Sequence, residues 1–206
     1  MTMPASCSLK YSRGWSGRGW LEDWKGRSPS AKLEIYTDGG KIPYFDWAAW
    51  GFVIPLDHDN EDSPYLWNSE VQEDVTHNGA EVMAAAKALE WVAENHNLVQ
   101  NQQVEIITDS LKVFVGLDGQ IDVWASNDWK VKHGKKKTFA GSRREVSEKE
   151  VWVYLYAQKI RLESMGFQVT SKHVPGHSGV YWNVKVDGFV TGRLRNYKNG
   201  TTEKWA

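Results

Sequence analysis

Short apolar segments bounded by turn residues predict five β-strands. The segments are rich in β-branched or aromatic residues, and they are residues 33–36, 48–54, 65–75, 104–108 and 167–173. The first runs into Thr37-Asp38-Gly39-Gly40, which predicts a strand that ends in a turn. The fourth is an apolar run typical of a buried parallel strand.

Two longer segments have the apolar spacing of helices. Asn78–Ala93 is rich in alanine, and Asn78 is its expected N-cap. Ser147–Met165 opens with the spacing of a capping box, Ser147 with Glu150, and Gly166 is expected to end it.

The remaining elements complete the predicted fold. Shorter helices are expected from Leu111 and over Asn183–Arg193, whereas residues 118–146 are polar and predict irregular structure. The resulting order β-β-β-α-β-α-α-β-α predicts an α/β fold, a mixed five-stranded sheet flanked by helices. The first three strands are expected to form a meander, and the later strands to pair in parallel through helical crossovers.

The length of 206 residues suits one domain with tails. Residues 32–194 carry the predicted elements. Residues 1–31 are expected to form a flexible N-terminal extension, with a targeting signal or a small docking element as the alternative. Residues 195–206 are expected to form a polar C-terminal tail.

Charge and cysteine content narrow the function classes. The net charge is −1, so any contact with nucleic acid has to come from a local basic patch. The single cysteine, Cys7, permits no internal disulfide, which fits a reducing intracellular compartment. No apolar run approaches the roughly 20 residues that span a bilayer, so we expect no membrane partner.

Three acidic residues lie at positions where chemistry is expected. Asp38 follows the first strand, Glu81 lies in the first turn of the alanine-rich helix, and Asp109 follows the buried strand. The carboxyl ends of parallel strands meet at one edge of a sheet, so Asp38 and Asp109 meet if their strands are neighbours. Singly, each acid also fits a turn, a helix dipole or an N-cap. Together they would repel one another unless a divalent metal held them.

A fourth segment adds His177 on a glycine-flanked loop and Asp187 ten residues later. Taken alone, His177 also fits a surface loop histidine, and Asp187 also fits an exposed helix charge.

Four motifs together resemble type 1 ribonuclease H. The last of them, VPGHSG, is closer to the form in eukaryotic-type enzymes than to the typical bacterial form. The four motifs occur in that family's order over residues 32–194: YTDGG at 36–40, AE-x-x-A-A-x-x-A-L-E at 80–90, TDS at 108–110, and VPGHSG at 174–179 with Asn183 and Asp187.

By this resemblance, residues 32–194 form a catalytic domain that cuts the RNA strand of RNA–DNA hybrids and leaves 5′-phosphate and 3′-hydroxyl ends. The resemblance implies four metal-binding carboxylates: Asp38, Glu81, Asp109 and Asp187. It implies two Mg²⁺ ions, with Mn²⁺ as a substitute, and two such ions about 3.5–4 Å apart suit phosphodiester hydrolysis. His177 resembles the mobile histidine that assists proton transfer or product release.

A local basic patch, residues 126–144, contains seven Lys or Arg and one acid. It resembles the protrusion that grips the DNA strand in many family members, although a solvated charged loop is the alternative. Its candidate substrate contacts are Trp124, Trp129, Lys130, Lys132, Lys135, Lys136 and Lys137.

Telling a hybrid from duplex DNA requires contacts to 2′-hydroxyls on one strand. The candidates that the resemblance implies for these and other substrate contacts are Gly39, Gly40, Thr76, His77, Asn78 and Asn183. Thr76 matches the threonine of the family's phosphate-binding pocket for the DNA strand.

Three departures from the family pattern affect affinity for the DNA partner strand. His77 stands where the family often has Asn, Asp74 where eukaryotic-type members can carry Arg, and Ser147 and Glu148 where the pocket commonly has Asn. Glu148 would repel phosphate. A non-catalytic nucleic-acid-binding module is therefore the alternative function, and an integrase or resolvase of the same superfold is a third. A monomer in the nucleus or cytoplasm is expected, with the mitochondrion left open.

Overall fold

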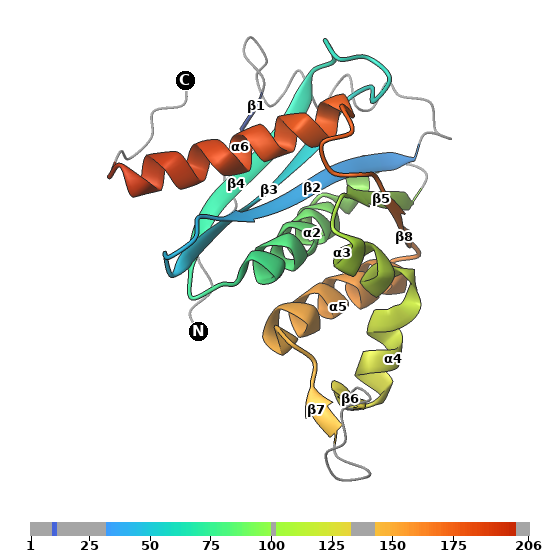
Figure 1. Cartoon of the computed structure of the whole chain (residues 1–206). Helices are drawn as coiled ribbons and strands as arrows, with labels where there is room; N and C mark the ends of the chain where they lie inside the picture. The colour runs from blue at the N-terminus through green and yellow to red at the C-terminus, as the bar shows by residue number, and fades with distance from the viewer. Residues whose placement is uncertain (1–9, 12–31, 100–101, 133–142, 201–206) are drawn as a thin grey trace.

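The computed structural model describes residues 10–11, 32–99, 102–132 and 143–200. Its centre is a mixed sheet with helices on both faces (Figure 1). The strand order across the sheet is β1 (Lys10–Tyr11), β4 (Tyr65–Glu73), β3 (Trp47–Pro55), β2 (Leu33–Lys41), β5 (Gln103–Thr108) and β8 (Gln168–His173). The pairs from β1 to β2 are antiparallel, and β2–β5 and β5–β8 are parallel. The five predicted strands are confirmed, and β1 adds a two-residue strand at one edge.

The turn predicted at residues 37–40 is wrong, because β2 continues to Lys41. Asp38 pairs with Gly51 and Gly40 with Ala49 in the antiparallel ladder with β3. The partner strand is long enough to hydrogen-bond the backbone of this segment. That pairing outweighs the local preference of two glycines for a turn.

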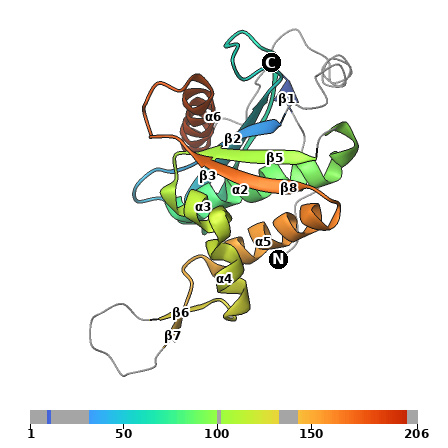
Figure 2. The same ribbon diagram turned by 90° about the vertical axis from the view of Figure 1, so that its right-hand side faces the viewer.

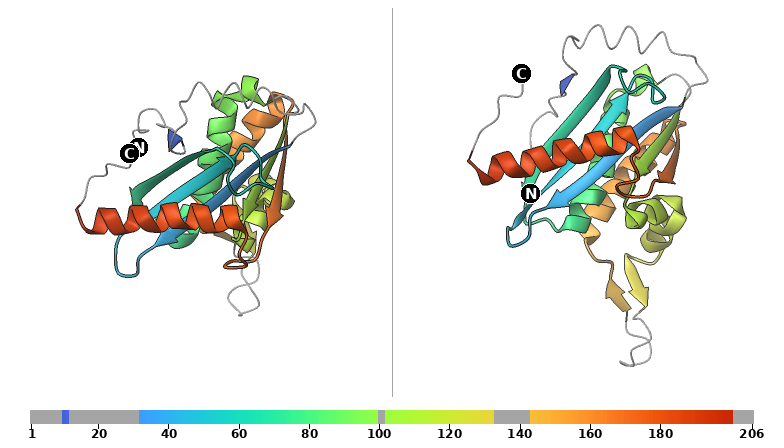
Figure 3. Two further views of the ribbon diagram at one scale, coloured as in Figure 1. Left: turned by 90° about the horizontal axis from the view of Figure 1, so that it is seen from above. Right: turned by 45° about the horizontal axis from the view of Figure 1, so that its top comes forward.

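Three long helices cover the sheet. α2 (His77–Glu94) and α5 (Lys149–Ser164) lie on one side, and α6 (Tyr181–Lys198) crosses the other side (Figures 1 and 3). α6 is longer than predicted and takes in four residues of the segment expected to be a tail, 195–198. Tyr197 explains this extension, since its ring packs edge-on against Trp47 and its hydroxyl donates to Glu73.

Two predicted helix caps are wrong. The hydroxyl of Thr76, not Asn78, caps α2 by accepting the N–H of Gly79. The capping box of Ser147 and Glu150 does not form, because Glu148 precedes α5 in a left-handed conformation with φ 56°. The predicted end of α5 is confirmed, since Gly166 follows it with φ 87°.

Part of the segment predicted to be irregular, 118–146, is helical or extended. α3 (Leu111–Val115) is followed by a kinked segment, η2 (Gly116–Gln120), in which Asp118 and Gly119 leave helical geometry, and then by α4 (Ile121–Ser126). Earlier in the chain, a 3₁₀ turn, η1 (His96–Leu98), follows α2. Two short antiparallel strands, β6 (Lys130–Lys132) and β7 (Arg143–Glu145), then project from the body (Figure 2). Packing against α5 explains these helices. Gly116, between α3 and α4, lies so close to the Trp152 ring of α5 that an added Cβ would be 2.5 Å from that ring.

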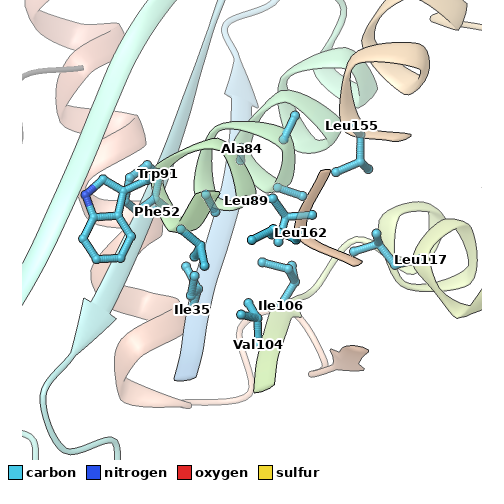
Figure 4. Close-up of a cluster of buried hydrophobic side chains, with 14 of the residues drawn as sticks. Ile35, Phe52, Ala84, Leu89, Trp91, Val104, Ile106, Leu117, Leu155 and Leu162 are labelled. Atoms are coloured by element: carbon cyan, nitrogen blue, oxygen red, sulfur yellow. The ribbon is translucent and has the colours of Figure 1, made fainter. Parts of the chain in front are cut away.

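Buried side chains fill both faces of the sheet. Figure 4 shows the larger cluster, in which Ile35 and Ile106 of the sheet lie near Leu89 of α2 and Leu162 of α5. A second cluster joins the opposite face to α6 through residues such as Trp182. Each fully buried side chain of this size contributes about 1.5–3 kcal/mol. Among the described residues, no helix combines the length and apolarity that a bilayer crossing needs.

Candidate active site

The parallel pairing of β2 with β5 brings two of the predicted acids to one edge of the sheet. The last paired residues are Thr37 and Thr108, and Asp38 and Asp109 follow them directly. This arrangement is the one expected if the two strands are parallel neighbours.

Two glycines let helices approach β2 closely on its opposite faces. A Cβ on Gly39 would lie 2.2 Å from the backbone nitrogen of Glu81, so α2 lies against the strand at this point. A Cβ on Gly40 would lie 2.9 Å from Val190 of α6. Successive residues of a strand face opposite sides, so the glycine pair serves both helices. The close approach at Gly39 is what carries Glu81 to Asp38.

Asp38, Glu81 and Asp109 form a compact group, called the acidic trio below. One carboxylate oxygen from each lies within 4.8 Å of the others. Asp38 and Glu81 are buried, with 8% and 7% exposure. The Oε2 atom of Glu81 is buried and has no hydrogen-bond partner among the described residues. Hard oxygen ligands with an unsatisfied buried atom fit a divalent cation such as Mg²⁺.

The pKa values of two of these carboxyl groups also indicate a cation site. Burial, followed by the charges of Asp109 and Asp187, raises the pKa of Asp38 to about 7, although the N–H of Gly39 donates to its Oδ1 at 2.8 Å and opposes the rise. Burial, followed by the charges of Asp38 and Asp109, raises the pKa of Glu81 to about 9. A cation would favour the charged forms and reverse both shifts.

Neighbouring elements hold Asp109 in place. The amide nitrogen of Asn183 donates to Asp109 Oδ2 at 3.2 Å, and a ring nitrogen of His173 lies 3.2 Å from the Asp109 carbonyl oxygen. A Cβ on Gly176 would lie 3.3 Å from the same Oδ2. From the sequence, Asn183 is expected only as a substrate contact. Its position four residues before Asp187, on the same helix face, is the signal that could have placed it at the site.

Asp187 and His177 are not members of the group whose carboxylate oxygens lie within 4.8 Å of one another. Asp187 is exposed on α6 and accepts a hydrogen bond from Thr191 at 3.3 Å, yet its charge still affects Asp38. His177 is exposed in the loop between β8 and α6, with φ 55°. It directly follows Gly176, which packs against Asp109.

The other predicted substrate residues divide into exposed and packed positions. Thr76, His77 and Asn78 are exposed at the start of α2, and His77 Nε2 lies 3.6 Å from Glu81 Oε1. Gly39 and Gly40 have their backbones in the β2–β3 ladder.

The two tryptophans beside the basic segment pack inward. Trp124 makes an edge contact with Trp152, and Trp129 with Tyr156. Packing on α5 therefore accounts for both rings.

The lysines of the basic segment are less fully described. Lys130 is exposed and paired with Asp128, and Lys132 lies in β6. Residues 135–137 are outside the described residues.

Solved structures share the fold. The N-terminal RNase H domain of Rv2228c from Mycobacterium tuberculosis is 18% identical with a TM-score of 0.55, and the match covers 83% of this chain and 99% of that one. LC11-RNase H1, isolated from compost and solved in complex with an RNA/DNA hybrid, is 22% identical with a TM-score of 0.57, covering 81% and 99%.

Curated proteins match over most of their length. Ribonuclease H of Brucella anthropi is 26% identical over 175 residues, 82% of this chain and 94% of that protein. Ribonuclease H of Ruthia magnifica is 28% identical over 160 residues, 77% and 92%. The RNase H family model matches residues 30–194, which include every strand and helix that carries the acidic trio. The chain therefore belongs to the ribonuclease H family.

Proposed function

We propose that this chain is a metal-dependent endonuclease that hydrolyses the RNA strand of RNA–DNA hybrids and leaves 5′-phosphate and 3′-hydroxyl ends. The acidic trio carries the proposal, because three carboxylates from β2, α2 and the end of β5 share one small volume. Such a cluster is costly without a cation. Family membership supplies the reaction class, and a relative of the same fold has been solved with an RNA/DNA hybrid.

The proposed ligands of two Mg²⁺ ions, with Mn²⁺ as a substitute, are the acidic trio and Asp187. Bound ions of this kind activate a water and stabilise the charge on the leaving oxygen. The chain's own residues orient the metal-binding carboxylates and assist the transfer of protons. Asn183 holds one oxygen of Asp109, and Gly39 holds one oxygen of Asp38, so both carboxylates are oriented before substrate arrives. His177 is proposed to assist proton transfer or product release from its exposed loop.

Substrate contacts are proposed on the surface around the trio. The exposed start of α2, with His77 and Asn78, and the backbone at Gly39 and Gly40 are proposed to read the hybrid's sugars and phosphates. Thr76 is proposed as a further phosphate contact when its hydroxyl is not donating to Glu148. The hairpin of β6 and β7, whose residues Arg143 and Arg144 are exposed, is proposed to contact the DNA strand. We propose that the chain acts as a monomer inside the cell.

A cleavage assay tests this function. The full chain with Mg²⁺ and an end-labelled hybrid should release RNA fragments while leaving duplex DNA intact. Asp109→Asn should lower the rate at least about a hundredfold, because it removes one charged metal ligand, and should leave hybrid binding within about threefold. Folded wild-type protein that binds hybrid with no dependence on Mg²⁺ and cuts nothing would show the alternative, a non-catalytic binding module.

A further inference from the structure

The side chain of Glu148 joins three elements next to the candidate active site. Its Oε1 accepts the hydroxyl of Thr76 at 3.1 Å, and its Oε2 accepts the ammonium of Lys112 at 2.7 Å. Lys112 also donates to the hydroxyl of Ser147 at 3.2 Å. Both oxygens of this one carboxylate thus accept hydrogen bonds, one from a hydroxyl at the start of α2 and the other from the ammonium group of α3.

This contact is built into the fold. Glu148 has φ 56° and ψ 35°, a left-handed conformation that disfavours any residue with a Cβ. Its side chain is 15% exposed. Burial opposes its charge, but hydrogen bonds from Lys112 and Ser147 outweigh burial and lower its pKa. The donors therefore hold Glu148 as an anion.

The same donors lie only a few residues from two members of the acidic trio. Thr76 precedes Glu81 by five residues, about 7.5 Å along a helix axis. Lys112 follows Asp109 by three residues. A double helix carries one phosphate charge for about every 1.7 Å of its axis, so a hybrid held at the acidic trio presents phosphates across this distance. A hydroxyl and an ammonium would be suitable partners for one of them.

We propose that Glu148 is an autoinhibitory residue, whose carboxylate takes the place of a substrate phosphate on Lys112 and Thr76. The inference rests on the proposed function. With Glu148 in place, the hybrid binds without a phosphate contact at this point. Neutralising Glu148 releases Lys112 and lets the hybrid gain that contact.

The test compares hybrid affinity over a range of salt concentrations in the full chain carrying Asp109→Asn, which prevents turnover. Glu148→Gln should lower the Kd for hybrid about threefold or more at low salt, and should steepen the slope of log K against log salt by about 0.9, the value for one phosphate contact. Glu150→Gln is the matched control. It removes the same charge two residues away, outside the contact, and should change the Kd by less than about twofold.

Two further measurements separate this inference from a general charge effect. Lys112→Ala combined with Glu148→Gln should lose the gain in affinity. A neutral methylphosphonate at one particular position of the hybrid should lose it too, whereas a merely structural role for Glu148 would give no single sensitive position. Glu148→Asn, which tolerates the left-handed backbone, replaces Glu148→Gln if melting shows that variant unfolded.

The proposal is overturned if Glu148→Gln binds no tighter than Glu150→Gln, or if its gain is insensitive to methylphosphonates at every position. Failure of the proposed function looks different. In that case the wild-type chain does not cut hybrid in Mg²⁺, whatever Glu148→Gln does to binding.

Discussion

At the scale of single residues, buried carboxylates carry the chemistry and oppose stability. Asp38 and Glu81 have raised pKa values, so the folded chain without metal binds protons that the unfolded chain releases. The stability that the neutral forms contribute is fully present below about pH 4. It is lost as the pH rises towards about 7 for Asp38 and about 9 for Glu81.

This predicts how the stability of the protein responds to pH and metal. In chelator, the free energy of unfolding of the wild-type chain should fall by at least about 1 kcal/mol between pH 4 and pH 9 relative to the variant D38N/E81Q. Excess Mg²⁺ should restore stability to the wild type and not to the variant, because a cation stabilises the charged carboxylates. Urea titrations at several pH values measure both effects. Parallel pH profiles for the two proteins would contradict the account.

Gly39 provides a second prediction at this scale. Gly39→Ala would place a Cβ 2.2 Å from the Glu81 backbone, so it should destabilise the chain by about 1–3 kcal/mol and slow hybrid cleavage at least about tenfold. The matched control is Gly188→Ala in α6, where an added Cβ meets nothing within 4 Å. It should stabilise the chain by up to about 1 kcal/mol. Equal melting temperatures for the two variants would show that α2 does not press against β2.

The sequence predicts the acidic trio well and its supporting contacts poorly. Asp38, Glu81 and Asp109 each follow or open a strongly patterned element, so their convergence follows from the fold class. The contacts of Asn183 with Asp109 and of Glu148 with Thr76 join residues 74 and 72 positions apart. No local pattern encodes such contacts, because they depend on how the completed elements pack.

At the scale of elements, periodicity predicts the strands and long helices, and tertiary packing decides their ends. β2 continues through the residues predicted to form a turn, because β3 pairs with it as far as Lys41. α4 forms within a segment too polar to predict it, because α5 supplies the apolar partner and Lys159 of α5 pairs with Asp122 of α4. In both cases the partner, β3 for β2 and α5 for α4, lies outside the segment whose structure it decides.

The α4–α5 contact gives a prediction at this scale. Trp152 is fully buried, against Trp124 on one side and the space left by Gly116 on the other. Trp152→Ala should cost about 3–5 kcal/mol of unfolding free energy, measured in urea. Val153→Ala, at an exposed position of the same helix, should change it by less than about 0.5 kcal/mol. A small loss for Trp152→Ala would mean that α4 does not depend on α5.

At the scale of the whole molecule, the sheet order brings distant parts of the chain to one edge. β2 pairs with β3 on one side and β5 on the other, α2 covers one face and α6 the other, and the acidic trio lies where β2, β5 and α2 meet. The site is therefore a product of the complete fold. The described residues contain a rival group, Asp57, His58 and Asp59, which is exposed in the β3–β4 loop.

Anomalous diffraction from crystals of the full chain grown with Mn²⁺ and hybrid is the decisive measurement of where the cations bind. We expect strong peaks bounded by Asp38, Glu81 and Asp109, at about 2.0–2.2 Å from carboxylate oxygens. Peaks confined to Asp57–Asp59, or none at the acidic trio in protein that cuts hybrid, would contradict this expectation.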